Sequence, residues 1–319
     1  MSLVKYEILN KVAELQSFTK AADAMALTQS AVSHAITNLE SEFGFPLVNR
    51  NRAGITLTTE GETMLLAIRK VLQENEKVHQ EAASLLGLAK GTIKIGIFKS
   101  VSTKWLPEII RLMEKNYPEI QIQLKEGDYL EIEQWLLSGE IDCGFINITH
   151  SSQFHIISLK KDRLLSGEID CGFINITHSS QFHIISLKKD RLLCVVSNQS
   201  ALYHQKTVSF EDLEKEPFIM PTYGGYHDIK QLFEEHGIQP DIRFELMDES
   251  AILSMVTHHL GISILPEMLL DSIPQELRAI PFQVDSYRSI GLATRYHLSP
   301  AAKKFAETTQ AWLQDSDKL

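Results

Sequence analysis

Residues 28–58 read TQSAVSHAITNLESEFGFPLVNRNRAGITLT, and the first half of this stretch has a clear amphipathic pattern. Its apolar residues recur at steps of three and four, which predicts a helix with one buried stripe. Thr28 is suited to cap the start of this helix, and Gly44 followed by Pro46 predicts its end. The opposite face is rich in short hydrogen-bonding side chains. The stripe consists of Val32, Ala35, Ile36, Leu39 and Phe43.

A second short helix is predicted just upstream, over residues 19–25, and a three-residue turn joins the two helices. Such a pair is typical of a helix-turn-helix, whose later helix lies in the DNA major groove. Downstream, residues 47–58 predict a short hairpin, or wing, with cations suited to phosphate or minor-groove contacts. The alternative is a small helical subdomain with a solvated polar face. The residues predicted to contact DNA are Gln29, Ser30, Ser33, His34, Thr37, Arg50 and Arg52.

A long helix is predicted from Thr59 to about Leu86, and Thr59-x-x-Glu62 at its start has the capping-box pattern. Along it, residues recur in alternating steps of four and three, the spacing of a coiled-coil seam. We expect this helix to pair two subunits, and packing on its own domain is the alternative. Asn75 is the polar member, of the kind that fixes register. The predicted dimerisation seam is Met64, Ile68, Val71, Asn75, Val78, Ala82 and Leu85.

From Gly91 onward, predicted strands and helices alternate, which indicates a parallel sheet covered by helices. The segment between the first strand and the next helix carries the hydroxyls of Ser100, Ser102 and Thr103. Hydroxyls beside a helix N-terminus suit a small anion or carboxylate, and open α/β sheets bind ligands beyond the carboxyl ends of strands. Simple capping of the helix is the alternative.

Residues 136–163, LLSGEIDCGFINITHSSQFHIISLKKDR, recur without change as residues 164–191. Architectural repeats drift and need several copies to bury a face, so this repeat has another origin. It indicates a recent tandem duplication or an error in the sequence, and an intact-mass measurement distinguishes the two. We expect one copy to fill the sheet position while the other forms a surface excursion or is absent from the molecule.

The composition bounds the class of protein. With 319 residues, two or three domains are expected. The net charge is −10, and residues 1–91 hold nine Lys and Arg against ten Asp and Glu, so DNA affinity would need locally gathered cations and dimerisation. No apolar run is long enough for a membrane span, and no secretion leader is evident. The three cysteines form no framework, which fits a reducing cytoplasm.

Motifs typical of enzymes are missing: the sequence has no HExxH, GxSxG, P-loop or GxGxxG. His258 and His259 are adjacent and cannot share one helix face. His150 and His155, with their copies His178 and His183, lie in a Ser- and His-rich stretch that we interpret as a solvated loop. We therefore expect no enzyme activity, no metal and no cofactor.

Five short motifs follow one another in register within the N-terminal sixty residues. They are Phe18-Thr19-x-Ala21-Ala22, Leu27-Thr28-Gln29-Ser30-Ala31-Val32-Ser33, Leu39-Glu40, Gly44-x-Pro46-Leu47-x-x-Arg50 and Leu57-Thr58-x-x-Gly61. With these motifs the N-terminal region resembles that of LysR-type transcriptional regulators. Val48 stands where the family usually has Phe, Ala53 where it has a second basic residue with Arg52 one position earlier, and His34 where Arg is common.

The resemblance implies an α+β multi-domain fold: a winged helix-turn-helix (1–58), a linker helix and hinge (59–91), and a two-lobed α/β effector domain (92–319) like that of periplasmic binding proteins. Lobe I is expected over residues 92–196 plus 297–319, and lobe II over 197–296. An unidentified small-molecule co-inducer would bind between the lobes. The residues implied to contact it are Ser100, Ser102, Thr103, Asp128, Asn147 or its copy Asn175, Thr222, Tyr223 and Ser263.

The expected function is therefore that of a ligand-responsive transcription regulator. Its partners would be a double-stranded DNA operator, the effector, and further copies of the chain in a homodimer and then a homotetramer, with RNA polymerase a further candidate. The alternative from another class is a cytoplasmic solute-binding protein whose N-terminal helices serve only for assembly. Retardation of DNA by residues 1–91 would distinguish the two.

Overall fold

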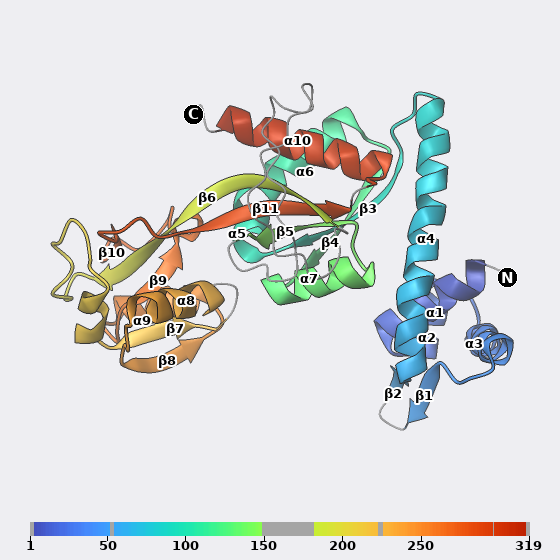
Figure 1. Cartoon of the computed structure of the whole chain (residues 1–319), viewed down its shortest axis with the longest axis horizontal. Coiled ribbons are helices and arrows are strands. Elements are labelled where there is room, and N and C mark those ends of the chain that lie inside the picture. The colour runs from blue at the N-terminus through green and yellow to red at the C-terminus, as the bar shows by residue number, and fades with distance from the viewer. Residues whose placement is uncertain (1–2, 52–53, 149–181, 223–225, 296, 317–319) are drawn as a thin grey trace.

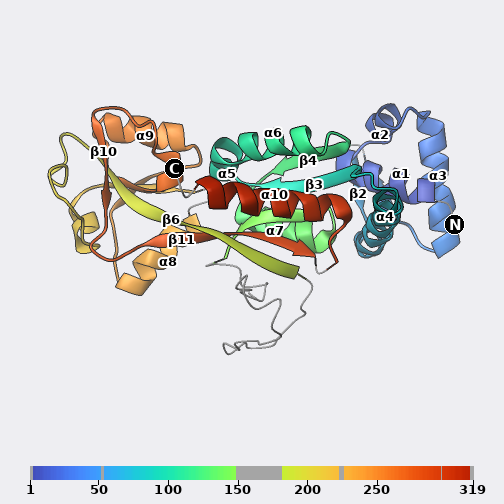
Figure 2. The same ribbon diagram turned by 90° about the horizontal axis from the view of Figure 1, so that it is seen from above.

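The computed structural model describes residues 3–51, 54–148, 182–222, 226–295 and 297–316. An N-terminal helical unit lies at one end of the molecule, and a long helix joins it to two α/β lobes (Figure 1). Lobe I lies in the middle and lobe II at the far end, and two long strands run between them (Figure 2). Within the described residues, no helix is both long and apolar enough to cross a membrane.

The N-terminal unit is a winged helix-turn-helix. Thr28 caps α3 by accepting a hydrogen bond from the Ala31 N–H, and Gly44 ends the helix with φ +83°, as the sequence predicted. The wing strands are antiparallel, with Arg50 opposite Ile55. The elements are α1 (Leu3–Leu15), α2 (Phe18–Ala24), α3 (Gln29–Phe43), β1 (Val48–Asn51) and β2 (Gly54–Leu57).

The linker helix α4 (Thr59–Leu85) is capped one residue earlier than the sequence suggested. Thr58, not Thr59, is the N-cap, and its hydroxyl accepts a hydrogen bond from the Gly61 N–H at 2.9 Å. A Cβ on Gly61 would lie 2.0 Å from the Leu47 carbonyl oxygen, so only glycine lets α4 pass this close to the wing.

The expected dimerisation seam divides into two parts. Ile68 is buried in the core of the winged unit, and half-buried Met64 packs against that core. The same helical stripe continues beyond that core, where Val71, Val78 and Leu85 are exposed. The buried side chain of Ile68 is therefore covered within its own subunit, because the apolar period alone does not tell which surface covers the stripe. For the other seam residues, pairing with a second subunit stays a prediction.

One sheet with strand order β10-β6-β11-β5-β3-β4 runs through both lobes. Lobe I contains the strands from β4 to the first half of β6. The strands β3, β4 and β5 are parallel, whereas β11 is antiparallel to its neighbours. Helices α6 and α10 cover one face and α7 the other (Figure 1). The elements are β3 (Gly91–Ile97), α5 (Lys99–Lys104), α6 (Leu106–Asn116), β4 (Ile120–Glu126), α7 (Tyr129–Ser138), β5 (Cys143–Asn147), β6 (Phe182–Ser197), β11 (Tyr287–Arg295) and α10 (Pro300–Ser316).

Lobe II has its own apolar clusters on both sides of the second half of β6. This half of β6 pairs with β9 and β10, and β7 pairs with β8. The elements are the 3-10 helix η1 (Glu211–Lys215), β7 (Phe218–Pro221), α8 (Tyr226–His236), β8 (Ile242–Leu246), α9 (Glu249–Thr257), β9 (Ser263–Pro266), the 3-10 helix η2 (Glu267–Leu269) and β10 (Leu277–Pro281).

The chain changes lobe earlier than the sequence suggested. β6 pairs with β11 as far as Arg191 and with β9 and β10 from Leu192, so it passes from lobe I to lobe II near its middle. β11 pairs with the first half of β6 from Tyr287 to Arg295 and with β5 over residues 290–294, so the chain returns to lobe I where β11 begins. The expected boundaries near residues 197 and 296 are corrected to about 191 and 287, because single long strands cross between the lobes.

The repeated segment contributes to the sheet from both copies. The first copy supplies the end of α7 and all of β5, and the second supplies Phe182–Arg191 at the start of β6. Neither copy alone fills the sheet position, contrary to the expectation. Residues 149–181, with Cys171 and Asn175, lie outside the described residues.

Removing one repeat should preserve the fold. Deletion of residues 154–181 rejoins Gln153 to Phe182 and shortens the connection between β5 and β6 by 28 residues without changing either strand. Because a shorter connection loses less entropy on closure, we expect the free energy of unfolding to rise by about 1.5 kcal/mol. Urea unfolding of both chains measures this, and a less stable deletion variant would contradict it.

Candidate functional site

The outer face of α3 is a polar surface open to solvent. Val32, Ile36 and Leu39 are fully buried beneath it. The side chains predicted to contact DNA point the other way, because a helix that buries one stripe must expose the opposite one. Of these, Gln29, Ser30, His34 and Thr37 are exposed and Ser33 is half-buried.

Arg50 joins the wing to this helix. Its Nη2 donates to the Thr37 hydroxyl at 3.2 Å and lies 3.8 Å from a Glu40 carboxylate oxygen. Its guanidinium also lies 5.2 Å from the Phe18 ring centroid. The exposed cation is therefore held beside the polar face of α3. Arg52 lies outside the described residues.

Glu40 is a structural member of this surface that the sequence analysis did not assign. One of its carboxylate oxygens accepts hydrogen bonds from the Leu47 and Val48 N–H groups, at 2.9 and 3.2 Å. The same side chain attracts Arg50. Glu40 thus fixes the entry to the wing and the position of its cation together.

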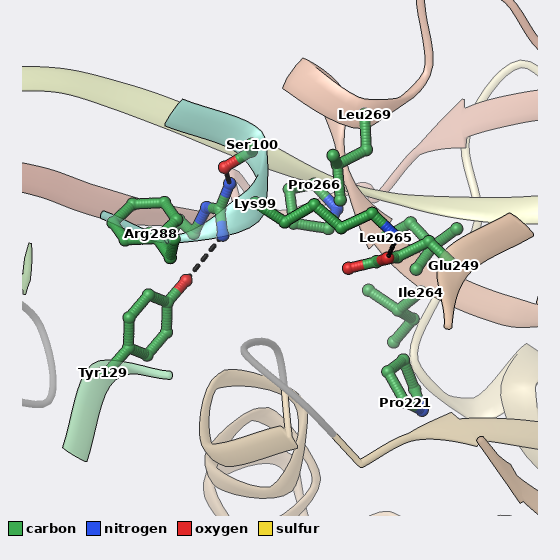
Figure 3. Close-up of a pocket in the computed structure, with 11 residues that line it drawn as sticks. Lys99, Ser100, Tyr129, Pro221, Glu249, Ile264, Leu265, Pro266, Leu269 and Arg288 are labelled. Carbon is green, nitrogen blue, oxygen red and sulfur yellow. Dashed lines mark hydrogen bonds and ion pairs between the residues drawn. The ribbon is translucent and has the colours of Figure 1, made fainter. Parts of the chain in front are cut away.

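A second candidate site is a small cavity between the lobes, shown in Figure 3. Its volume is about 20 Å³, which is room for about one water molecule. The cleft is therefore nearly closed in this structure. Lobe I and the crossing strand β11 line it with Phe98, Lys99, Ser100, Tyr129 and Arg288, and lobe II with Pro221, Glu249, Ile264, Leu265, Pro266 and Leu269.

A buried cluster around Arg288 forms the floor of this cavity. The Arg288 guanidinium donates twice to the Asp190 carboxylate, at 2.6 and 2.9 Å, where β6 and β11 cross between the lobes. It also donates to the Ser100 hydroxyl at 2.6 Å and to the Tyr129 hydroxyl at 2.5 Å. Asp190 in turn accepts from the Met268 N–H of lobe II, so the cluster touches both lobes.

Four further polar contacts hold the lobes together. Lys99 forms ion pairs with Asp248 at 3.0 Å and with Glu249. Although burial lowers the pKa of Lys99, the hydrogen bonds and charges of these carboxylates outweigh it and raise the pKa overall. The Asn147 amide donates to buried Asp228 at 2.5 Å, and Lys104 pairs with Asp271 at 2.6 Å. These contacts close the two lobes upon each other.

Of the residues expected to contact an effector, the structure places Ser100 in the cavity wall. The segment expected as a loop is helix α5, and the hydroxyls of Ser102 and Thr103 donate to the Lys99 carbonyl within it. Asp128 caps α7 in a capping box, which explains an acidic residue there. These three side chains satisfy local backbone groups, as short polar residues often do.

The remaining expected residues are placed differently. Asn147 bridges the lobes through Asp228, and the Ser263 hydroxyl is buried and donates to the Ile219 carbonyl. The backbone N–H of Thr222 donates to the Leu246 carbonyl, outside the cavity lining. Tyr223 lies outside the described residues.

The sequence analysis missed most of the ionisable side chains at the cleft. Arg288, Asp190, Tyr129 and Glu249 come from four different elements and form no local motif. Among the described residues, no group of three His, Cys, Asp or Glu side chains is arranged to hold a metal. Cys143 and Cys194 are buried, and burial raises the pKa of both thiols.

Polar side chains of α4 dock the linker helix on lobe I. Gln73 donates to the Gly139 carbonyl at 3.0 Å, and Arg69 pairs with Glu140 at 2.8 Å. Buried Gln80 donates to the Thr92 carbonyl and accepts from the Ala301 N–H. The winged helix-turn-helix unit and lobe I are thereby joined within one chain.

Two family models cover most of the chain. The model described as "Bacterial regulatory helix-turn-helix protein, lysR family" matches residues 3–62, and "LysR substrate binding domain" matches residues 87–162 and 154–314. The two matches of the second model together span both copies of the repeated segment.

Curated relatives match nearly end to end. The uncharacterized HTH-type transcriptional regulator YvbU of Bacillus subtilis is 31% identical over 312 residues, covering 96% of this chain and 97% of the relative. The HTH-type transcriptional activator CmpR of Synechocystis is 27% identical over 267 residues, covering 83% of this chain and 78% of the relative.

Solved structures share the fold. A full-length OxyR variant from Pseudomonas aeruginosa has a TM-score of 0.72 at 18% identity, covering 98% of this chain and 95% of that one. Full-length CbnR in complex with its target DNA has a TM-score of 0.61 at 20% identity, covering 98% and 99%. Full-length BenM has a TM-score of 0.57 at 25% identity, covering 99% and 98%. Together, the family models, the relatives and the described architecture show that this chain belongs to the LysR-type family of DNA-binding transcriptional regulators, which are not enzymes.

Proposed function

We propose that the exposed face of α3 reads base edges in a duplex operator while Arg50 contacts the adjacent phosphates. The observation that carries this proposal is the joint placement of an uncharged hydrogen-bonding helix face and a wing cation, linked by the bond from Arg50 to Thr37. Hydroxyl and imidazole groups suit base edges, whereas a guanidinium suits phosphate. Ser33, His34 and Thr37 would make the base contacts.

The C-terminal half of α4 would pair two such units into a homodimer. Val71, Val78 and Leu85 are exposed along one face beyond the winged core, and large apolar side chains in a row favour a partner surface. Two copies of α3 would then meet two half-sites, which compensates for the nearly neutral charge of residues 1–91. Pairing of the lobes would extend the dimer to a homotetramer.

An unidentified small-molecule co-inducer would bind in the cleft between the lobes and change their arrangement. Helix α7 connects this cleft to the linker helix: Tyr129 at its start bonds Arg288, and the turn after its end bonds Gln73 and Arg69 of α4. A ligand that prefers one lobe arrangement would shift the population toward it and so change operator spacing or bending. Such a regulator would act in the cytoplasm, with RNA polymerase as a further partner.

DNA retardation by residues 1–91 tests the proposed interface directly. Among the residues that the structure describes, those in the core of the winged unit lie between Tyr6 and Leu72, and all of them are within this fragment. We expect the fragment to dimerise and to retard duplex DNA in a gel. A folded dimer that does not retard the duplex at low salt would contradict the proposal that this surface binds DNA.

Replacing Arg50 should weaken binding to every DNA sequence alike. Arg50→Ala removes one phosphate contact, so the negative slope of log K against log salt concentration should become shallower by about 1. Arg111→Ala, at an exposed cation of lobe I paired with Glu108, serves as the matched control. A slope equal to that of the unchanged protein would place Arg50 outside the DNA interface.

A charge on the exposed seam should prevent pairing. Val78→Glu would bury a carboxylate against a second copy, so we expect fragment 1–91 to become monomeric in analytical ultracentrifugation. His79→Glu adds the same charge at the neighbouring exposed position and should leave the dimer intact. Equal behaviour of the two variants would count against the seam.

A further inference from the structure

At the floor of the cleft, two hydroxyl groups have a proton left to donate to a ligand. Ser100 and Tyr129 each accept a hydrogen bond from Arg288, so the remaining proton of each hydroxyl is left to donate. Within the described residues, neither hydroxyl donates a bond. Burial raises the pKa of Tyr129, which keeps its proton in place at neutral pH. All three side chains are buried and line the cavity, so this floor offers donors to a ligand.

The lobe II wall of the same cleft is acidic. Glu249 lines the cavity, and Asp248 next to it shares the ion pair with Lys99. Buried Asp228 lies outside the lining, and its charge acts on both Tyr129 and Arg288. Arg288 is already paired with Asp190. Lys99 extends across the cavity to Glu249, away from the Arg288 cluster (Figure 3). Its single ammonium faces two carboxylates, so the wall retains negative charge.

We propose that the cleft binds a small zwitterion of the amino-acid class. The ligand carboxylate would accept from the Ser100 and Tyr129 hydroxyls beside the Arg288 guanidinium, and the ligand ammonium would take the place of Lys99 on Glu249 and Asp248. Its apolar carbons would contact Ile264, Leu269 and Pro221, which line the cavity between these ends. Because the cavity now holds about one water molecule, binding must separate the lobes and release the Lys99 bridge. This inference rests on the proposed effector site.

Four six-carbon probes test how much each of the two charges of such a ligand contributes to binding. 6-Aminohexanoate and norleucine carry both charges at different spacings, hexanoate carries only the carboxylate, and hexylamine only the ammonium. We expect one of the zwitterions to raise the melting temperature of the full chain more than either singly charged probe at equal concentration. Equal or larger shifts with hexanoate or hexylamine, or no shift with any probe, would overturn the inference.

Variants then assign the two ends. Tyr129→Phe should weaken binding of the stabilising zwitterion about tenfold, and Glu249→Gln should weaken it similarly. Lys99→Met removes the internal competitor and should strengthen binding about tenfold. Lys215→Met, at an exposed lysine paired with Asp212 outside the cavity, and Tyr203→Phe are the matched controls and should change nothing. Weaker binding in Lys99→Met, or unchanged binding in both Tyr129→Phe and Glu249→Gln, would overturn the assignment. DNA retardation by the same preparations is read separately, so a failure here would leave the proposed DNA interface standing.

Discussion

The effector domain depends on the buried ion pair between Arg288 and Asp190. Taking both charges out of water is unfavourable unless every donor and acceptor is matched, and removing one partner of such a pair typically costs about 3–5 kcal/mol. Here the guanidinium is satisfied by Asp190, Ser100 and Tyr129, and the carboxylate also accepts from Met268. The pair lies where β6 and β11 pass from lobe I to lobe II, so one interaction fixes the crossing strands and shapes the floor of the cleft.

Matched polar groups also join the effector domain to the DNA-binding unit. Glu140 is shared by Arg69 and Lys125, and although burial raises its pKa, these two cations lower it overall, so the carboxylate stays charged. Hydrogen bonds from Gln73 and Gln80 complete the contact between α4 and lobe I. Polar contacts of this kind stabilise one arrangement, and they can be exchanged for water more readily than an apolar core.

Local patterns were sufficient for the N-terminal unit. Neighbours in sequence determine the apolar stripe of α3, its N-cap Thr28 and its end at Gly44. The match to the helix-turn-helix family model confirmed the fold of this unit. The seam on α4 was only partly predictable, because Ile68 and Val78 have the same period although one lies under the winged core and the other is exposed. The capping position also moved by one residue, since Thr58 and Thr59 are equally suited in sequence.

The cleft was harder to predict because its residues are distant in the sequence. Arg288, Asp190 and Tyr129 meet only once β11, β6 and α7 are packed, and no spacing rule joins them. Conversely, Ser102 and Thr103 looked like ligand contacts but bond to their own helix backbone. The boundary between the lobes was missed because β6 is one continuous strand of 16 residues. Its first half pairs with β11 in lobe I, and its second half pairs with β9 and β10 in lobe II.

The small volume of the interlobe cavity has a kinetic consequence. An effector larger than a water molecule, bound as proposed, would enter only after Lys99 leaves Glu249 and the lobes separate. At high ligand concentration, the observed association rate constant would therefore stop rising and level off at the rate of lobe opening. The response time of the regulator would then be set by an internal bridge and not by how often the signal molecule collides with it.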